Sequence, residues 1–430
     1  MAMVVKNNMS AISTLNTLNK NSSALSKSLQ KVSSGMKING AADDASGYAI
    51  SERMRVQIRG LDQANQNTQN GSSMMKVAEG AVSSTVDILK TLKEKVINAA
   101  NDTNTDADRQ TIQKELDQSI DQINDNANVT YNGKYLVDGS HNSKVTATTT
   151  SMTNQSLNTE TKFDSTFTAL TDRNGNSLNI QSSDTITLSY VKEGKTKTIS
   201  VSGASTLTNL INEVSTDIKA GTATSVIGKD VAGDTVYTAD GKSAITLTAA
   251  GSGVESQISG ITLSVTDTKG NVKKSANALL DNFSESIRAQ NKSNDNSINL
   301  QVGTKSNQAI KVGLTDMRAE ALGLQAKDGT TLNISTKDYA NAAINVLDNA
   351  VQKALDQQTT IGAVQSRLEY TSSNLTTASE NVQSSESTIR DADMAKEMTN
   401  YTKNNVLMQA AQAMLSQANQ SSSSVLSLLQ

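Results

Sequence analysis

The chain contains no cysteine, no proline and no tryptophan among its 430 residues, and it has a single histidine. Without cysteine there is no disulfide framework, thiolate zinc site, iron–sulfur cluster or cysteine nucleophile, and His141 alone does not build a polyhistidine metal site. Because average usage of proline is roughly 5%, its complete absence predicts backbone runs that must not be interrupted. Long helices are the structure that this absence favours.

Apolar residues and net charge are also scarce. The hydrophobic fraction is 36%, below the roughly 45–50% of typical globular chains, which predicts thin cores. The 39 Lys and Arg nearly balance the 42 Asp and Glu, so no global field favours nucleic acid or an anionic membrane as a partner. No apolar run approaches the roughly 18 residues of a membrane span, and MAMVVKNNMSAIS lacks the apolar region of a secretory signal. On these rules alone we expect a cytoplasmic protein.

Three stretches of the chain differ in texture. Residues 1 to about 140 are helix-like, residues 142–296 are rich in Thr, Ser and Gly with short β runs, and residues 297–430 are again helix-like. Insertions are best tolerated at surface loops. We therefore predict a mainly α protein, in which long antiparallel coiled-coil helices from both termini form inner and outer layers, with an inserted mixed α+β, mainly β domain that faces solvent.

Heptad patterns of apolar residues mark the long helices. In the second half, every seventh residue from Leu347 to Ile389 is apolar, but the companion positions are mostly polar, so neighbouring helices must complete the core. A shorter helix is predicted after the capping pair Thr105 and Asp108. The first half carries a left-handed coiled-coil seam with alternating spacings of three and four: Leu61, Ala64, Thr68, Gly71, Met75, Ala78, Val82, Thr85, Leu89, Leu92, Val96 and Ala99.

The two ends of the chain carry weaker heptad strips. They contain Ser, Asn and Ala where a stable dimeric coil prefers Leu or Ile, and Asn and Ser side chains compete for backbone hydrogen bonds. A segment that keeps the pattern but does not fold alone is most simply explained by folding on assembly, when many copies bury the strips together. The predicted assembly core consists of Val4, Ala11, Leu18, Leu25, Val32, Leu407, Ala411, Met414, Ala418, Val425 and Leu428.

The middle of the chain shows alternation with period two. The runs DTITLSYV, KTKTISVSG, SAITLTAAG and GITLSVTDTKGN are bounded by Gly and Asn or Asp, which predicts antiparallel strands. TLTNLINEVSTDI predicts a short amphipathic helix, and SINLQVGTKSNQAIKVGLTDM predicts a hairpin outside the insertion.

No catalytic or phosphate-binding motif occurs, since the chain lacks GxGxxG, GxxxxGK[ST], HExxH and GxSxG patterns. Asp43 and Asp44 form a pair that has the chemistry to bind a cation, but two acids at a loop-to-helix junction are more often N-caps. Lys90 and Lys93 lie away from the seam and lack interleaved aromatics, so they predict a solvated face and not a nucleic-acid platform. We expect neither an enzyme nor a bound cofactor.

Two long runs resemble the bacterial flagellin family. SLQKVSSGMKINGAADDASGYAISERMRVQIRGLDQANQNTQNGSSMMKVAEGAV is similar to its N-terminal signature. IGAVQSRLEYTSSNLTTASENVQSSESTIRDADMAKEM, followed by LMQAAQAMLSQANQSSSSVLSLLQ, is similar to its C-terminal signature. With YNGKYLVDG and the LQVG hairpin, the resemblance covers roughly residues 1–141 and 297–430, while residues 142–296 match only loosely, as a hypervariable insertion of the family does.

The resemblance implies a structural subunit that self-assembles into the helical flagellar filament for motility. Residues 1–42 and 397–430 would be terminal helices of the inner core, 43–141 and 297–396 an outer helical bundle with a β-hairpin, and 142–296 the solvent-facing insertion. Asp43 and Asp44 would lie at the junction of the two layers. Flagellins leave the cell unfolded through the flagellar type III export apparatus, so the implied location is secreted and extracellular. Implied partners are other copies of the chain, the export apparatus with its chaperone, the filament cap and hook-junction proteins.

Flagellins are also ligands of a vertebrate Toll-like receptor. By resemblance, Glu94 and Glu115 fit the family pattern, whereas Thr91 replaces a usual Arg, Lys95 an expected Leu and Asn98 a Gln. Losing an arginine and placing a charge at an apolar contact would weaken such an interface. The corresponding receptor-facing segment comprises Lys90, Thr91, Lys93, Glu94, Lys95, Asn98 and Glu115.

Alternatives stay open at this stage. A hook–filament junction protein would share the termini but match the interior signatures less completely. A flagellin carrying a protease in its insertion would need an HExxH helix, and residues 142–296 contain no histidine. An adhesive or immune-binding role of the insertion is a further possibility.

Overall fold

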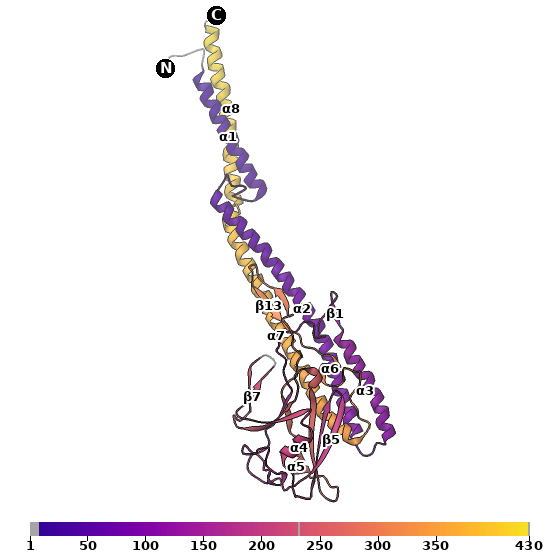
Figure 1. Ribbon diagram of the computed structural model, residues 1–430. Helices are drawn as coiled ribbons and strands as arrows, with labels where there is room; N and C mark the ends of the chain where they lie inside the picture. Colours follow the sequence, from indigo (N-terminus) through magenta and orange to yellow (C-terminus); the bar gives the residue numbers. More distant parts are fainter. Residues whose placement is uncertain (1–7, 231–232, 429–430) are drawn as a thin grey trace. The chain divides into compact units, whose positions relative to one another are not determined.

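The computed structural model describes residues 8–230 and 233–428 (Figure 1). About half of the chain is helical, and the strands are concentrated in the middle of the sequence. This confirms the predicted class, with long helices from both termini and a β-rich middle. The chain divides into two compact units. We call residues 1–68, 301–308 and 370–430 the terminal unit, and residues 69–300 and 309–369 the central unit.

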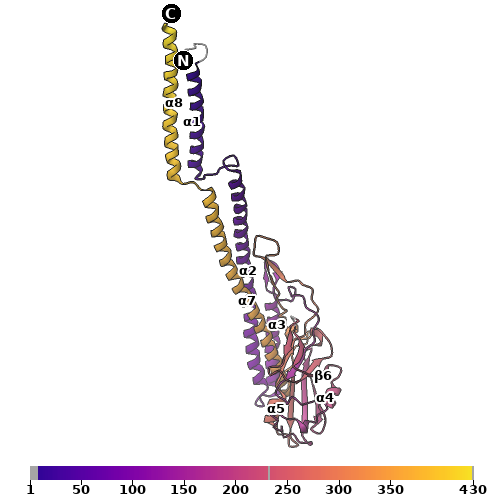
Figure 2. The same cartoon turned by 90° about the vertical axis from the view of Figure 1, so that its left-hand side faces the viewer.

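Two helices from opposite ends of the chain dominate the terminal unit. Helices α1 (Met9–Ser34) and α8 (Met394–Leu428) lie side by side (Figures 1 and 2). Helix α1 begins at the N-cap Asn8, whose side chain accepts a hydrogen bond from the backbone N–H of Ala11. It ends at Gly35, which has a φ of 70°. This left-handed conformation favours glycine and terminates the helix.

Helices α2 (Ala45–Ala99) and α7 (Lys337–Arg390) run through both units. In the terminal unit, Leu61 and Ala64 of α2 pack with Leu375 of α7, and Ala378 and Val382 lie against them. Polar pairs flank this cluster, including a hydrogen bond of 2.7 Å between the side chains of Ser372 and Asn65. The strip on α7 is narrow, as its polar companion positions predict.

In the central unit, the remaining seam residues of α2, from Gly71 to Ala99, are buried, as are Leu61, Ala64 and Thr68 in the terminal unit. Every predicted seam position is therefore confirmed as buried. Helix α3 (Asp106–Ala127) begins with a capping box in which Thr105 and Asp108 bond each other's backbone N–H. A short helix, α6 (Ala319–Leu322), precedes α7.

The β-rich part of the central unit contains two main antiparallel sheets, ordered β10-β4-β5 and β11-β3-β9-β6, and three hairpins, β1-β2, β7-β8 and β12-β13, within the described residues. It also holds helices α4 (Leu207–Glu213) and α5 (Lys274–Leu280) and two 3-10 turns, η1 (Phe167–Ala169) and η2 (Val254–Ser256). The strands are β1 (Thr130–Tyr131), β2 (Lys134–Tyr135), β3 (Ser151–Asn154), β4 (Thr185–Lys192), β5 (Lys195–Ser202), β6 (Ile218–Ala223), β7 (Val226–Lys229), β8 (Thr235–Tyr237), β9 (Ala244–Ala249), β10 (Ile258–Thr266), β11 (Phe283–Ile287), β12 (Ile298–Gln301) and β13 (Ala309–Val312).

These elements confirm the four predicted β runs and the hairpin at 298–312. The helix predicted over TLTNLINEVSTDI is shorter than expected, since α4 ends at Glu213 and Ile218 already begins β6. The sheets share one apolar core that includes Phe167, Tyr190 and Leu247. Strand β10 lies directly on α7, because a Cβ added at Gly260 would stand 2.9 Å from Val346 Cγ2. The side-chain amide of Asn349 donates to the Ser259 carbonyl at 2.8 Å, which ties the sheet to the long helix.

Candidate assembly surface

Asparagine side chains join α1 to α8. The amide of Asn8 donates to the Ala418 carbonyl at 3.0 Å, and that of Asn21 donates to the Leu407 carbonyl at 3.1 Å. Further along, the amide of Asn404 donates to the Ser28 hydroxyl at 3.1 Å. These contacts make the pair antiparallel. In the sequence, Asn counts only as a poor helix former, so its composition gives no sign of these cross-helix bonds.

The predicted assembly residues divide between the two faces of this pair. Ala11, Leu18, Leu25 and Val32 are half-buried on α1, Ala411 is buried and Ala418 half-buried on α8. By contrast, Leu407 and Met414 are 41% and 63% exposed. Val4 lies outside the described residues. Val425 and Leu428 belong to the last turns of α8, where the side chains are not described.

The α1–α8 pair leaves large apolar side chains uncovered. Between the two helices runs an open groove of about 520 Å³, lined mainly by Met9, Met414 and small polar residues. Leu29 is 52% exposed even though its neighbour Ser28 is buried. Large exposed apolar side chains gathered on one pair of helices favour an interaction site. The exposed set comprises Met9, Ile12, Leu15 and Leu29 on α1 and Met394, Met398, Val406, Leu407 and Met414 on α8.

The segment between α1 and α2 is held to the junction of α7 and α8. Lys37 donates its backbone N–H to the Arg390 carbonyl at 2.7 Å, and Ala392 donates to the Gly35 carbonyl at 2.9 Å. The buried guanidinium of Arg390 bonds Glu52 at 2.6 Å and lies over the ring of Tyr48. The hydrogen bond from Arg390 holds the pKa of Glu52 below its usual value. No sequence pattern singled out Arg390.

The two acids at the start of α2 make local backbone contacts. Asp44 Oδ1 accepts the N–H groups of Ser46 and Gly47, each at 3.0 Å, so Asp44 caps α2. Asp43 Oδ2 accepts the N–H of Asn39 at 3.1 Å. The capping role that the sequence favoured over a cation site therefore applies to Asp44, whereas Asp43 bonds the loop before α2.

Comparison with known proteins gives the family of the chain. The family model "Bacterial flagellin N-terminal helical region" matches residues 5–142, and "Bacterial flagellin C-terminal helical region" matches residues 344–429. A flagellin of Clostridium tyrobutyricum is 36% identical over 97% of this chain and 99% of its own length. The chain belongs to the bacterial flagellin family.

Other relatives are similar over their full length. A flagellin of Bacillus subtilis is 30% identical, covering 99% of this chain and 100% of its own. The flagellar filament 33 kDa core protein of Treponema phagedenis is 28% identical, covering 99% and 100%. Among solved structures, flagellar hook associated protein-3 of Legionella pneumophila is 15% identical, covering 78% of this chain and 97% of its own, with a TM-score of 0.35.

Family membership confirms a structural subunit of the flagellar filament and not an enzyme. The flagellin family forms the extracellular filament of the flagellum, which corrects the cytoplasmic location expected from the absent signal peptide. The signal-peptide rule failed because it concerns one secretion route only. Among the helices of the described residues, none combines the length and apolarity that crossing a membrane requires.

The segment predicted to face the receptor lies on α2 and α3 in the central unit. Lys90, Thr91, Glu94 and Asn98 are exposed. Lys95 is joined to Glu115 of α3 by an ion pair of 3.0 Å. Lys93 instead pairs with Asp348 of α7, so the segment's charges are divided between two neighbouring helices.

Proposed function

We propose that the chain polymerises through α1 and α8, with residues 1–42 and 397–430 forming the inner core of the filament. Residues 43–141 and 297–396 then form the outer helical layer with its β-hairpin, residues 142–296 face solvent, and Asp43 and Asp44 stand at the junction of the layers. The observation that carries this proposal is the row of exposed apolar side chains on α1 and α8. In a single folded chain these side chains stay in contact with water, whereas a neighbouring copy of the chain buries them.

Assembly then supplies the stability that the terminal helices lack by themselves. Fully burying one large apolar side chain contributes roughly 1.5–3 kcal/mol, and the pair exposes several, including Leu29 and Met414. The Asn- and Ser-rich composition of both helices disfavours isolated helix formation. The chain therefore leaves the cell unfolded and folds on assembly, with the type III export apparatus, its chaperone, the filament cap and hook-junction proteins as partners by family resemblance.

Replacing an exposed apolar residue tests the assembly surface. Leu29→Asp places a charge where the single chain already exposes the side chain, so we expect the helices to keep their fold while filament formation is lost. Polymerisation is started with short filament seeds obtained by salting out, and negative-stain electron microscopy then measures whether filaments form. Ser26→Asp adds the same charge at an exposed polar position of α1 and is expected to polymerise normally. Normal filaments from Leu29→Asp would contradict the proposal, as they would from Leu18→Asp.

We further propose that this chain is a weak ligand of the vertebrate Toll-like receptor. The support is that Lys95, at the position of an apolar contact in the family pattern, is held as a charge beside Glu115. The double variant Thr91→Arg, Lys95→Leu is expected to raise activity in a receptor reporter assay at least about ten-fold. Lys76→Leu, another exposed lysine of α2, is the control that leaves activity unchanged. Equal receptor activation by the double variant and the parent would contradict the proposal that Thr91 and Lys95 weaken receptor binding.

A further inference from the structure

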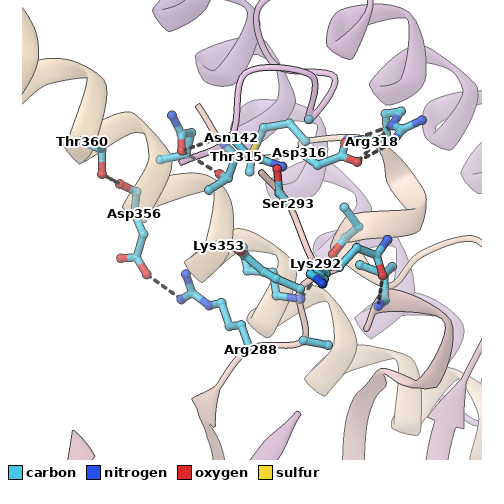
Figure 3. A pocket seen from close by; sticks show the side chains of 18 residues that line it. Asn142, Arg288, Lys292, Ser293, Thr315, Asp316, Arg318, Lys353, Asp356 and Thr360 are labelled. Atoms are coloured by element: carbon cyan, nitrogen blue, oxygen red, sulfur yellow. Dashed lines mark hydrogen bonds and ion pairs between the residues drawn. The ribbon is translucent and has the colours of Figure 1, made fainter. Parts of the chain in front are cut away.

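A cavity of about 340 Å³ lies within the central unit. It is lined by five separate parts of the chain, which lie at positions 139–142, 254, 288–293, 315–321 and 353–360 (Figure 3). A volume this size equals about eleven water molecules at roughly 30 Å³ each. It falls at the small end of ligand pockets, so it matches a compound of monosaccharide size.

Positive charge exceeds negative charge in the lining. The cations are Arg288, Lys292, Arg318 and Lys353, and the acids are Asp316 and Asp356. Arg318 is held by Asp316 at 2.6 Å, and Arg288 pairs with Asp356. Lys292 is exposed and makes no ion pair or hydrogen bond to any described residue. The cavity therefore keeps a cation with no intramolecular partner at its edge.

Lys353 is a second cation of the lining with spare bonding capacity (Figure 3). Its side chain is only 7% exposed. The ammonium group donates to the Ala321 carbonyl at 3.3 Å and lies 3.6 Å from Glu285 Oε1, whose carboxylate oxygens accept no hydrogen bond. An ammonium has three N–H donors, so the protein engages it incompletely. Accordingly, burial lowers the pKa of Lys353.

Two neutral groups of the lining also lack partners. Gln357 is 4% exposed, and its Oε1 accepts the backbone N–H and the hydroxyl of Thr315. Its Nε2, which has two N–H donors, has no partner, and neither does the buried Oδ1 acceptor of Asn142. Leaving a buried donor or acceptor unpaired costs free energy. A ligand that satisfies both groups recovers that free energy.

We propose that this cavity binds a small hydroxycarboxylate of the sugar-acid class. The carboxylate takes the N–H donors of Lys292, Lys353 and Gln357, since charge-assisted hydrogen bonds are the strong ones. A hydroxyl group donates to Asn142 Oδ1, a buried acceptor of the lining that has no hydrogen-bond donor. The mixed donor and acceptor pattern favours a hydroxylated organic anion over a simple inorganic one.

Equilibrium dialysis of the full-length protein against radiolabelled D-glucuronate at low salt tests the proposal. We expect one bound glucuronate per chain, and at least ten-fold weaker binding of the neutral sugar glucose. Lys292→Gln is expected to weaken binding at least five-fold. Gln357→Glu keeps the acceptor for Thr315 but replaces the free donor by a negative oxygen, so binding is expected to be lost. Lys219→Gln, an exposed lysine of β6 outside the lining, is the matched control with unchanged binding.

Three results would overturn the proposal: no bound glucuronate, equal binding by the parent and Lys292→Gln, or displacement of glucuronate by an equal concentration of sulfate. If Gln357→Glu fails to fold by circular dichroism, Lys292→Gln decides, because its side chain is exposed. Filament formation is not part of the readout, so failure here leaves the assembly proposal untouched.

Discussion

Asp281 is a carboxyl group whose environment opposes its charge. Burial raises its pKa to about 6, although the Leu263 N–H and the Asn345 amide stabilise the charged form. Because the folded pKa lies above the ordinary value of 3.8, the folded state binds the proton more tightly. Stability of the central unit therefore falls as pH rises from about 4 to about 6.

Asp281→Asn is expected to raise the melting temperature at pH 7.5 and to change it little at pH 4. The asparagine keeps an acceptor for Leu263 but has no charge to desolvate. With 1.36 kcal/mol per pKa unit, the gain is at most about 3 kcal/mol. Thermal unfolding of parent and variant across this pH range is the measurement, and an equal difference at both pH values would refute the assignment.

At the level of elements, the helices were predictable and several strands were not. Every residue from Leu61 to Ala99 in the seam is buried because a long amphipathic helix repeats one rule over many turns. Strand β3 has no apolar alternation, since all of its residues are buried between β9 and β11. Its Thr153 hydroxyl bonds Thr246 at 3.1 Å across the sheet. Such cross-strand polar pairing gives a single sequence no periodic signal.

The segment between α1 and α2 depends on one arginine. Arg390→Gln removes the hydrogen bond of the guanidinium to Glu52 and its contact with Tyr48, and charge-assisted hydrogen bonds are stronger than neutral ones. We expect faster hydrogen exchange at the amides of Lys37 and Ala392. Arg53→Gln, at an exposed position of α2, is the comparison variant. Unchanged protection in Arg390→Gln would show that the backbone bonds alone hold the segment.

For the whole molecule, the division into two units predicts independent behaviour of the ends. A chain lacking residues 1–42 and 397–430 loses α1 and nearly all of α8 but keeps the central unit intact. We expect it to retain the thermal transition of the central unit and to form no filaments under conditions in which the full chain does. Circular dichroism and negative-stain microscopy measure the two properties. Filaments from the shortened chain would place the assembly surface elsewhere.

The cavity of the central unit was beyond sequence reasoning for a different reason. Its lining includes Asn142, Lys292 and Gln357, which come from three distant parts of the chain. None of them belongs to a short motif with fixed spacing. By contrast, the terminal heptads and the family signatures are local patterns. What a single sequence specifies locally was predictable, and what tertiary packing assembles was not.

A β-bridge joins Met36 to Asp391. It places the break between α1 and α2 beside the break between α7 and α8. Helix α1 ends at Ser34 and helix α7 ends at Arg390. Neither of these two neighbouring segments therefore continues past that point as an unbroken helix. Under a bending load, the stiffness of the pair drops there, and strain concentrates in a few residues tied by backbone bonds. In mechanical terms, this level is an articulated joint between stiff rods, where a change of curvature requires the least distortion of helical backbone.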